Sequence, residues 1–244
     1  MHFNVYCQKV EYNWVHRKPP DLTVYYGTAD FFVNMIPTLY HHLSISERSR
    51  AELFQREADY NCYITVHALL RIELSKELGV KAGSIKMGES EKGRPYIDGA
   101  DLPFSLSRTK NLFAFVVGKG KQYLGIDIEQ IKPEIDFVGI ARSHFSHREQ
   151  QLVLSQKNIS DQKSLFFEIW TRKEALLKAI GIGINTELSK VQVLDGGNLL
   201  EIADVEINNH SFKIATAREK EAMISIASSK DFVPEFKNLS FVLQ

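Results

Sequence analysis

Two short segments constrain this chain more than any other feature. Residues 125–129 read Gly-Ile-Asp-Ile-Glu, an apolar, β-branched segment with acids at Asp127 and Glu129. Successive side chains of a β-strand point to opposite faces, so a strand here places both carboxylates on one face. The second segment runs from Trp170 to Lys178 and contains Glu174. Residues four apart are neighbours on a helix, so this segment predicts a carboxylate and an ammonium side by side.

These acids predict a metal site if they meet. Three carboxylates at one point repel each other unless a divalent cation lies between them, and ligation by oxygen alone suits Mg²⁺. A lysine beside Mg²⁺ is a combination that proteins use to handle phosphates. The alternative is a solvated strand face and a surface ion pair of little energetic value. Because Glu174 is flanked by Trp170 and Leu177, at the edge of an apolar helical stripe, we favour the metal site.

These motifs, with two more upstream, resemble those of the 4′-phosphopantetheinyl transferases, in the larger two-lobed (Sfp-type) branch. The convincing part of the resemblance runs from about Lys92 to Leu194, and a weaker part covers residues 44–79. The motifs, in chain order, are 91–95 (Glu-Lys-Gly-Arg-Pro), 104–107 (Phe-Ser-Leu-Ser), 125–129, 166–178 and 181–183 (Gly-Ile-Gly). Their order and spacing are specific to the family, whereas any single motif is not.

The resemblance implies an α+β fold with two similar α+β lobes. The lobes would be related by a pseudo-twofold axis, with the active site in the cleft between them. We place the N-terminal lobe, with the coenzyme A nucleotide contacts, at residues 1–118. The C-terminal lobe, with the metal acids and the Lys-Glu-x-x-x-Lys helix, then takes residues 119–244.

The resemblance also implies a reaction and its groups. The phosphopantetheine arm of coenzyme A would move onto a serine of an acyl or peptidyl carrier protein, releasing 3′,5′-ADP. Asp127, Glu129 and Glu174 match the acids that hold Mg²⁺, and Lys178 matches the lysine that contacts the phosphates. Glu149 matches a further acid, and either Glu149 or Glu174 takes the serine proton. A purely structural alternative is open, because 146–149 also reads as a capping box, Ser-x-x-Glu.

Coenzyme A contacts are expected upstream, where this chain departs from the family pattern. Arg94 and Ser107 match family positions that contact the nucleotide or phosphates. Ser105 stands where the family has asparagine, and Arg108 stands where it has a histidine that contacts a phosphate. Arg108 therefore either replaces that histidine as a permanent cation or points away. Three basic residues are available to bind the 3′-phosphate, Arg48, Arg50 and Arg56. The sequence does not indicate which of them does so.

Composition limits the alternatives. Lys plus Arg number 30, as do Asp plus Glu, so no overall field attracts nucleic acid or an anionic membrane. Two cysteines are too few for a disulfide framework, and neither a leader segment nor a long apolar run is visible. We therefore expect a cytoplasmic protein, and a monomer because two lobes already supply both walls of a cleft.

Two other functions compete with an active transferase. A non-catalytic descendant would bind carrier protein or coenzyme A without transfer, and the change at Arg108 favours it. A binding module, however, does not need three mutually repelling carboxylates. The hypothesis of another Mg²⁺-dependent phosphotransfer enzyme lacks support, because the sequence contains no P-loop or Rossmann glycine pattern. Nothing in the sequence indicates whether the carrier serves fatty-acid, polyketide or nonribosomal-peptide synthesis.

The local patterns also predict the main elements. A capping box at 44–47 opens the first of two helices with a break near 56–59, and Gly79 ends the second. A helix over 164–180 ends at Gly181. Glycine and lysine at 118–121 predict a hairpin that joins strands 112–117 and 123–129. Further strands are expected at 191–194, 199–207, 212–217 and 223–227, with a turn at 195–198.

Overall fold

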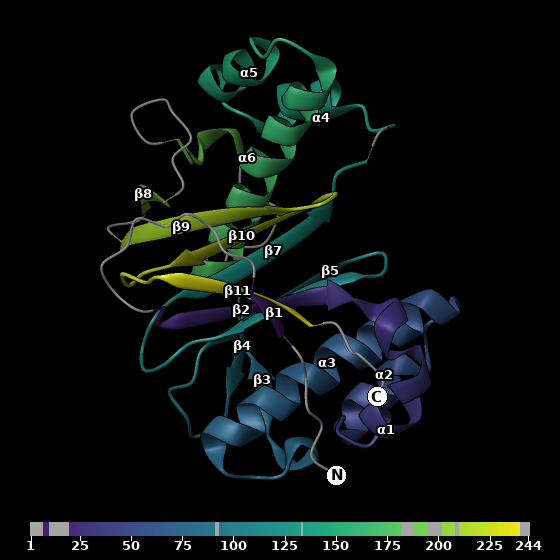
Figure 1. Cartoon of the computed structure of the whole chain (residues 1–244). Helices are drawn as coiled ribbons and strands as arrows, with labels where there is room; N and C mark the ends of the chain where they lie inside the picture. Colours follow the sequence, from purple (N-terminus) through teal and green to yellow (C-terminus); the bar gives the residue numbers. More distant parts are fainter. Residues whose placement is uncertain are drawn as a thin grey trace. The chain divides into compact units, whose positions relative to one another are not determined.

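A computed structural model describes residues 7–9 and 20–239, apart from 91–92, 133, 182–187, 195–201 and 208–209. The described chain forms two compact units, and each combines one main sheet with helices (Figure 1). Unit 1 holds the described parts of 1–88, 95–121 and 233–244, and unit 2 holds those of 89–94 and 122–232. The α+β class predicted from the sequence is confirmed.

Unit 1 is built on a five-stranded sheet with the order β1-β11-β2-β6-β5. Strand β11 runs parallel to β2, and the other neighbours are antiparallel. The strands are β1 (Cys7–Lys9), β2 (Leu22–Thr28), β5 (Phe104–Thr109), β6 (Leu112–Val117) and β11 (Pro234–Leu239). A small pair, β3 (Met87–Glu89) and β4 (Pro95–Ile97), forms a separate sheet.

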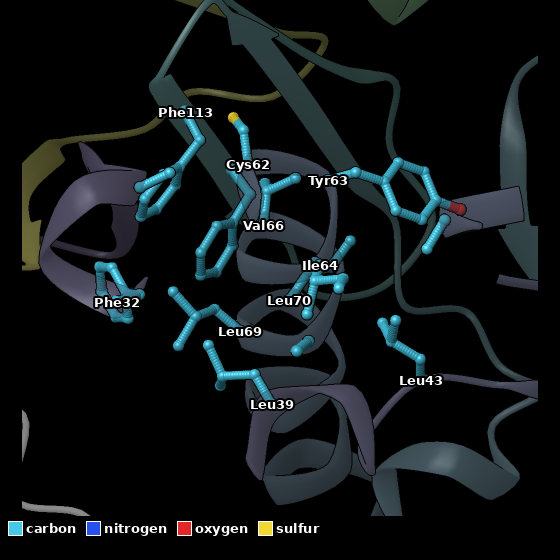
Figure 2. Packing of buried hydrophobic residues seen from close by; sticks show 14 of the residues in the cluster. Phe32, Leu39, Leu43, Cys62, Tyr63, Ile64, Val66, Leu69, Leu70 and Phe113 are labelled. Carbon is cyan, nitrogen blue, oxygen red and sulfur yellow. The ribbon is translucent and has the colours of Figure 1, made fainter. Parts of the chain in front are cut away.

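The long helix α3 (Glu57–Leu78) packs against β5 and β6 and organises the core of unit 1. Figure 2 shows the core: Leu69 on this helix lies near Leu39 and Phe32, while Cys62 lies near Phe113 of β6. Four shorter elements contact α3. They are η1 (Ala29–Met35), α1 (Ile36–Tyr40), α2 (Ile45–Ala51) and η2 (Ala82–Ser84).

Unit 2 is built on an antiparallel sheet with the order β7-β10-β9-β8. The strands are β7 (Leu124–Gln130), β8 (Ile202–Ile207), β9 (His210–Glu219) and β10 (Ala222–Ser228). Helix α6 (Ile159–Ile180) packs on β7, β10 and β9. Around this helix lie α4 (Phe137–His144), α5 (His147–Leu154) and η3 (Leu188–Lys190).

The helix boundaries follow the expected signals. Both predicted capping boxes are formed, at Ser44 with Glu47 and at Ser146 with Glu149. The break between α2 and α3 is confirmed. Gly79 and Gly181 end α3 and α6 in the left-handed conformation, with φ of 68° and 75°, as a glycine cap allows. None of the helices in the described part of the chain is long and apolar enough to cross a membrane.

Three predictions about elements are wrong. Strands β6 and β7 form no hairpin: β6 lies between β2 and β5, whereas β7 pairs with β10. An alternating pattern identifies a strand but not its partner, and residues of β7 pair with residues of β10 that lie 92 to 104 positions later in the sequence. Residues 191–194 form no strand, and α6 begins at Ile159, five residues before the expected start, because Asn158 caps it. Of the segment expected at 199–207, β8 covers 202–207, and the turn at 195–198 lies outside the described residues.

The two units are not consecutive stretches of chain. The prediction divides the lobes at 118/119, and the chain passes from unit 1 to unit 2 close by, between Lys121 and Gln122. Strand β11, which follows unit 2 in the sequence, pairs with β2 and belongs to unit 1. A strand contributed from the end of a chain carries no local signal of the sheet it joins. The pseudo-twofold relation and the cleft between the lobes stay predictions.

Candidate active site

Close packing of helix α6 on strand β7 positions the acidic residues. A Cβ atom at Gly125 would lie 2.1 Å from the carbonyl oxygen of Ala175 and 2.4 Å from the backbone nitrogen of Ala179. No side chain fits there, so the helix backbone rests directly on the strand. A glycine inside a strand pattern is the sequence signal for such an approach. From the sequence, Gly125 was interpreted only as part of a motif, and this role in packing was missed.

Asp127 and Lys178 form an ion pair across this contact. The Lys178 Nζ donates a hydrogen bond of 2.7 Å to Asp127 Oδ1. The carboxylate side chain is 6% exposed and the lysine side chain 33% exposed. A charge-assisted bond at this distance is strong, and the exposed part of Lys178 keeps its charge within reach of solvent and of a ligand.

Glu174 completes the acidic group. Its pKa is raised, first because burial disfavours the charged form and second because Asp127 and Glu129 add negative charge. The positive charges of Lys178 and His144 act in the opposite direction. The Glu174 Oε1 is buried and makes no hydrogen bond to any described residue. The fold therefore brings Asp127, Glu129, Glu174 and Lys178 into one electrostatically coupled group.

The acidic group fits a divalent cation in its chemistry, although its side chains are not arranged around one. In the described part of the chain, no three His, Cys, Asp or Glu side chains are already arranged to hold a metal ion. The donor chemistry nevertheless fits a hard cation, because every donor is a carboxylate oxygen. The buried Oε1 of Glu174 and its raised pKa mark a place where added positive charge would be stabilising. We therefore take the group as chemically suited to Mg²⁺.

Glu149 has a different environment. Its side chain is 0% exposed and pairs with Lys173, also 0% exposed, at 2.8 Å. The carboxylate accepts a second bond of 2.8 Å from the backbone nitrogen of Ser146, as the capping box requires. The Lys173 Nζ also donates to the carbonyl oxygens of Leu188, at 2.7 Å, and Val191. The pair thus joins α5, α6 and the segment at 188–191, and sequence reasoning missed the role of Lys173.

Arg94 lies beside the start of β7, within unit 2. Its Nη2 donates to the carbonyl oxygen of Gln122 at 2.9 Å, and its guanidinium carbon lies 4.9 Å from the centre of the Tyr123 ring. A Cβ at Gly181, the residue that ends α6, would contact the Arg94 side chain at 3.2 Å. Partial burial lowers the pKa of Arg94. The residue therefore links the end of α6 to the start of β7.

Ser107 and Arg108 belong to unit 1, on strand β5. Ser107 is 7% exposed. The Arg108 guanidinium carbon lies 5.1 Å from the ring centre of Phe54 and 5.8 Å from that of Tyr63, as a cation–π contact. The structure thus gathers four of the predicted site residues in unit 2, and places these two in the other unit.

The chain is similar to several known proteins. The model of the 4′-phosphopantetheinyl transferase superfamily matches residues 123–231, the segment that carries all four grouped residues. The 4′-phosphopantetheinyl transferase HetI of Nostoc sp. is 30% identical over 215 residues, which cover 79% of this chain and 90% of the relative. The transferase pptA of Paxillus involutus is 27% identical over 187 residues, or 69% and 71% of the two chains. The transferase Sfp of Bacillus subtilis is 27% identical over 166 residues, or 66% and 72%.

Proposed function

Because the chain belongs to the 4′-phosphopantetheinyl transferase superfamily, we propose that it moves the phosphopantetheine arm of coenzyme A onto a serine of an acyl or peptidyl carrier protein. The other product is 3′,5′-ADP. The observation that carries the proposal is the coupled group of Asp127, Glu129, Glu174 and Lys178 on β7 and α6. A non-catalytic descendant is not favoured, because the group is retained in full and the relatives are named as transferases.

The three carboxylates would hold Mg²⁺, which when bound would neutralise charge on the pyrophosphate of coenzyme A. Lys178 has a partly exposed side chain and a charge fixed beside Asp127. An ammonium is a compact charge with three donors, suited to the developing charge on a leaving phosphate. Lys178 thus orients the phosphates and stabilises the product.

We propose that Glu174 is the general base that accepts the proton of the carrier serine. Its carboxylate belongs to the acidic group on β7 and α6, and its Oε1 makes no hydrogen bond to any described residue, so it has an oxygen that can accept a proton. Glu149 matches a family acid, but its carboxylate is fully buried and bonded to Lys173 and Ser146. The environment of Glu149 supports a role in holding α5 and α6 in place. Glu174 then accepts the serine proton, either directly or through a water molecule.

Coenzyme A binding involves Arg94, Ser107 and Arg108 in our proposal. For Arg108 the expectation is specific: Arg108→Ala raises the KM for coenzyme A several-fold and changes kcat less, the pattern of lost uniform binding. Arg108→His then restores affinity better at pH 6 than at pH 8.5, since an imidazole is charged only at the lower pH. An unchanged KM in Arg108→Ala means that the guanidinium serves only its contacts with Phe54 and Tyr63.

The deciding experiment is mass spectrometry of a panel of apo carrier proteins after incubation with this protein, coenzyme A and Mg²⁺. We expect a mass increase of one phosphopantetheine group on at least one carrier, lost with EDTA and in Asp127→Ala. Binding of a carrier without any mass increase would contradict the transferase. Transfer that persists in EDTA would contradict the metal mechanism alone.

The same panel identifies the pathway. It contains carriers of fatty-acid, polyketide and nonribosomal-peptide synthesis, and the carrier that gains the mass shows which pathway the protein serves. A cytoplasmic location and a monomeric state are parts of the same proposal. Light scattering tests the monomeric state, which a stable trimer would contradict. A trimer with the active site between its subunits would also contradict an active site within the two-lobed chain.

A further inference from the structure

A chain of three hydroxyl groups, two of them buried and the third half-buried, connects helix α6 to the sheet of unit 2. Thr171 Oγ1 on α6 lies 2.7 Å from Ser225 Oγ on β10, and Ser225 Oγ lies 3.0 Å from Thr216 Oγ1 on β9. Thr171 and Ser225 are both 0% exposed. We call these three residues the hydroxyl chain. Apolar residues such as Ala175 on α6 and Met223 and Ala227 on β10 belong to the core of this unit, so a polar chain within it needs an explanation.

The groups at its two ends fix the direction of its hydrogen bonds. The Nε of Arg172, which can only donate, bonds to Thr216 Oγ1 at 2.9 Å. At the other end, Thr171 Oγ1 donates to the carbonyl oxygen of Glu168 at 3.2 Å, which can only accept. Thr216 therefore donates to Ser225, and Ser225 to Thr171. Every hydroxyl proton is used, and a fully satisfied chain of this kind is rigid.

The hydroxyl chain lies next to the acidic group. Ser225 stands directly opposite Asp127 in the register of β7 and β10, so both side chains are on the sheet face that α6 covers. Thr171 is three residues before Glu174 on the helix, which is one turn away. The bond between Thr171 and Ser225 therefore fixes the helix against the strand at the point where Asp127 and Glu174 have to meet.

Unit 1 shows that packing a helix on such a sheet does not require hydroxyls. Counted from the hairpin turn, Phe115 of β6 and its partner Leu106 of β5 correspond to Ser225 and Thr216. Leu69, thirteenth in α3, corresponds to Thr171, thirteenth in α6. All three counterparts are apolar, and Tyr25 and Ile72 stand in unit 1 at the positions that match Asp127 and Glu174.

We propose that Thr171, Ser225 and Thr216 are positioning residues that set the spacing of Asp127 and Glu174 and thereby the affinity for the divalent cation. The inference rests on the metal part of the proposed function. It assigns the hydroxyl chain no contact with substrate. Removing any one bond lets α6 rotate or shift against β10, which separates the carboxylates without removing either.

The test measures binding of Mn²⁺, a probe that shares the preference of Mg²⁺ for carboxylate oxygen, by calorimetry or electron paramagnetic resonance on the full chain. Thr171→Val keeps the shape of the side chain and removes the hydroxyl, and Ser225→Ala removes the central link. We expect the Kd for Mn²⁺ to rise at least roughly tenfold in both, the scale found when groups that orient metal ligands are lost. Thr171→Ser keeps the hydroxyl and should bind Mn²⁺ within about threefold of the unmodified protein.

Ser228→Ala is the matched control. Ser228 is also 0% exposed on β10, and it donates to Gln122 Oε1 at 3.1 Å, away from α6. Its loss should lower the melting temperature about as much as Ser225→Ala and leave Mn²⁺ binding unchanged. If Thr171→Val and Ser225→Ala bind Mn²⁺ as tightly as the control, the hydroxyl chain only stabilises the fold and the inference is overturned. If the unmodified protein itself binds no Mn²⁺, the metal part of the proposed function fails first, and the inference with it.

Discussion

Units 1 and 2 share one arrangement of elements, although no repeat is visible in the sequence. In each, a seven-residue strand, β2 or β7, leads through short helices to a 22-residue helix that ends at a glycine. Each then forms a hairpin, β5 with β6 or β9 with β10, whose second strand pairs with β2 or β7. The units therefore resemble each other in this topology and in the lengths of the seven-residue strand and the long helix.

The units also share a buried ion pair. Arg71 is the fifteenth residue of α3, and Lys173 is the fifteenth of α6. Each pairs with the glutamate of a capping box, Glu47 or Glu149. Each also donates to carbonyl oxygens of the segment after its helix, those of Ala82 and Ile85 in unit 1 and of Leu188 and Val191 in unit 2. The pairs are thus part of the fold that both units use.

The units differ at the acids. In the strand register, Tyr25 and Gly27 of β2 stand where β7 has Asp127 and Glu129. Ile72 stands in α3 where α6 has Glu174, while Lys76 and Lys178 occupy the same helical position. In unit 1 the ring of Tyr25 stacks on Phe115 at 5.0 Å. A fold that forms without the acids does not need them for stability, so their presence in unit 2 is explained by function.

Removing an acid gives the largest expected effect and tests this difference directly. Glu174→Gln should lower transfer roughly a hundredfold or more, on the scale of losing one preorganised electrostatic group. Without Mg²⁺ the variant should be slightly more stable than the unmodified protein, because repulsion by Asp127 and Glu129 is relieved. Transfer assays and urea unfolding measure the two effects. Glu73→Gln on α3 is the control and should keep transfer within about twofold; equal losses would remove the distinction between the units.

The buried pairs should differ in energy, although they match in position. Lys173→Met leaves Glu149 charged and fully buried, and should cost about 3–5 kcal/mol of unfolding free energy. Arg71→Met should cost less, because Glu47 is 13% exposed and keeps His67 at 3.4 Å. Urea unfolding of both variants makes the comparison.

A double variant sharpens this result. Glu149→Gln combined with Lys173→Met removes both charges and should recover part of the stability lost in Lys173→Met, since no uncompensated charge remains. If the double variant loses as much unfolding free energy as the two single variants together, the unpaired charge of Glu149 is not the cause of the loss in Lys173→Met.

Packing of the helix on the first strand should also differ between the units. Gly125→Ala forces a Cβ into the backbone of α6 and should destabilise the protein by about 1–3 kcal/mol or more. Thr23, in the same position of β2, already carries a half-buried side chain, so Thr23→Ala should cost under about 1 kcal/mol. Thermal unfolding distinguishes the two, and a neutral Gly125→Ala would show that α6 does not rest on β7 as described.

The smallest effect is a pH dependence centred on Glu47. Burial alone would raise its pKa, but hydrogen bonds from His67 and Ser44 and the charge of Arg71 lower it from 4.5 to about 2. The native state therefore binds this proton more weakly than the unfolded state. The stabilisation is fully present above pH 4.5 and is lost as the pH falls to about 2. After discounting for solvent screening we expect about 1 kcal/mol.

Urea unfolding between pH 6 and pH 2 measures this loss, and Glu47→Gln should remove it. Glu174 in unit 2 should give the opposite slope without Mg²⁺. Its pKa is raised, so the native state binds the proton more tightly and stability increases as the pH falls toward 4.5. Matching slopes in Glu47→Gln and Glu174→Gln would contradict the assigned environments.

The sequence by itself determined whatever depends on neighbours along the chain. The capping boxes at Ser44 and Ser146 and the glycine ends of α3 and α6 are local hydrogen-bond patterns within a few residues. The alternation around Asp127 and the spacing of Glu174 and Lys178 are also local, and they placed the candidate acids on one strand face and one helix face.

Only the tertiary structure decided what meets across the chain. It paired β7 with β10 instead of β6, added β11 to the sheet of unit 1, and buried Glu149 against Lys173. It also aligned Ser225 with Asp127 and Thr171. Strand partners and helix packing depend on which apolar faces bury each other. That choice is a free-energy balance over residues far apart in the sequence, so no local pattern predicts it.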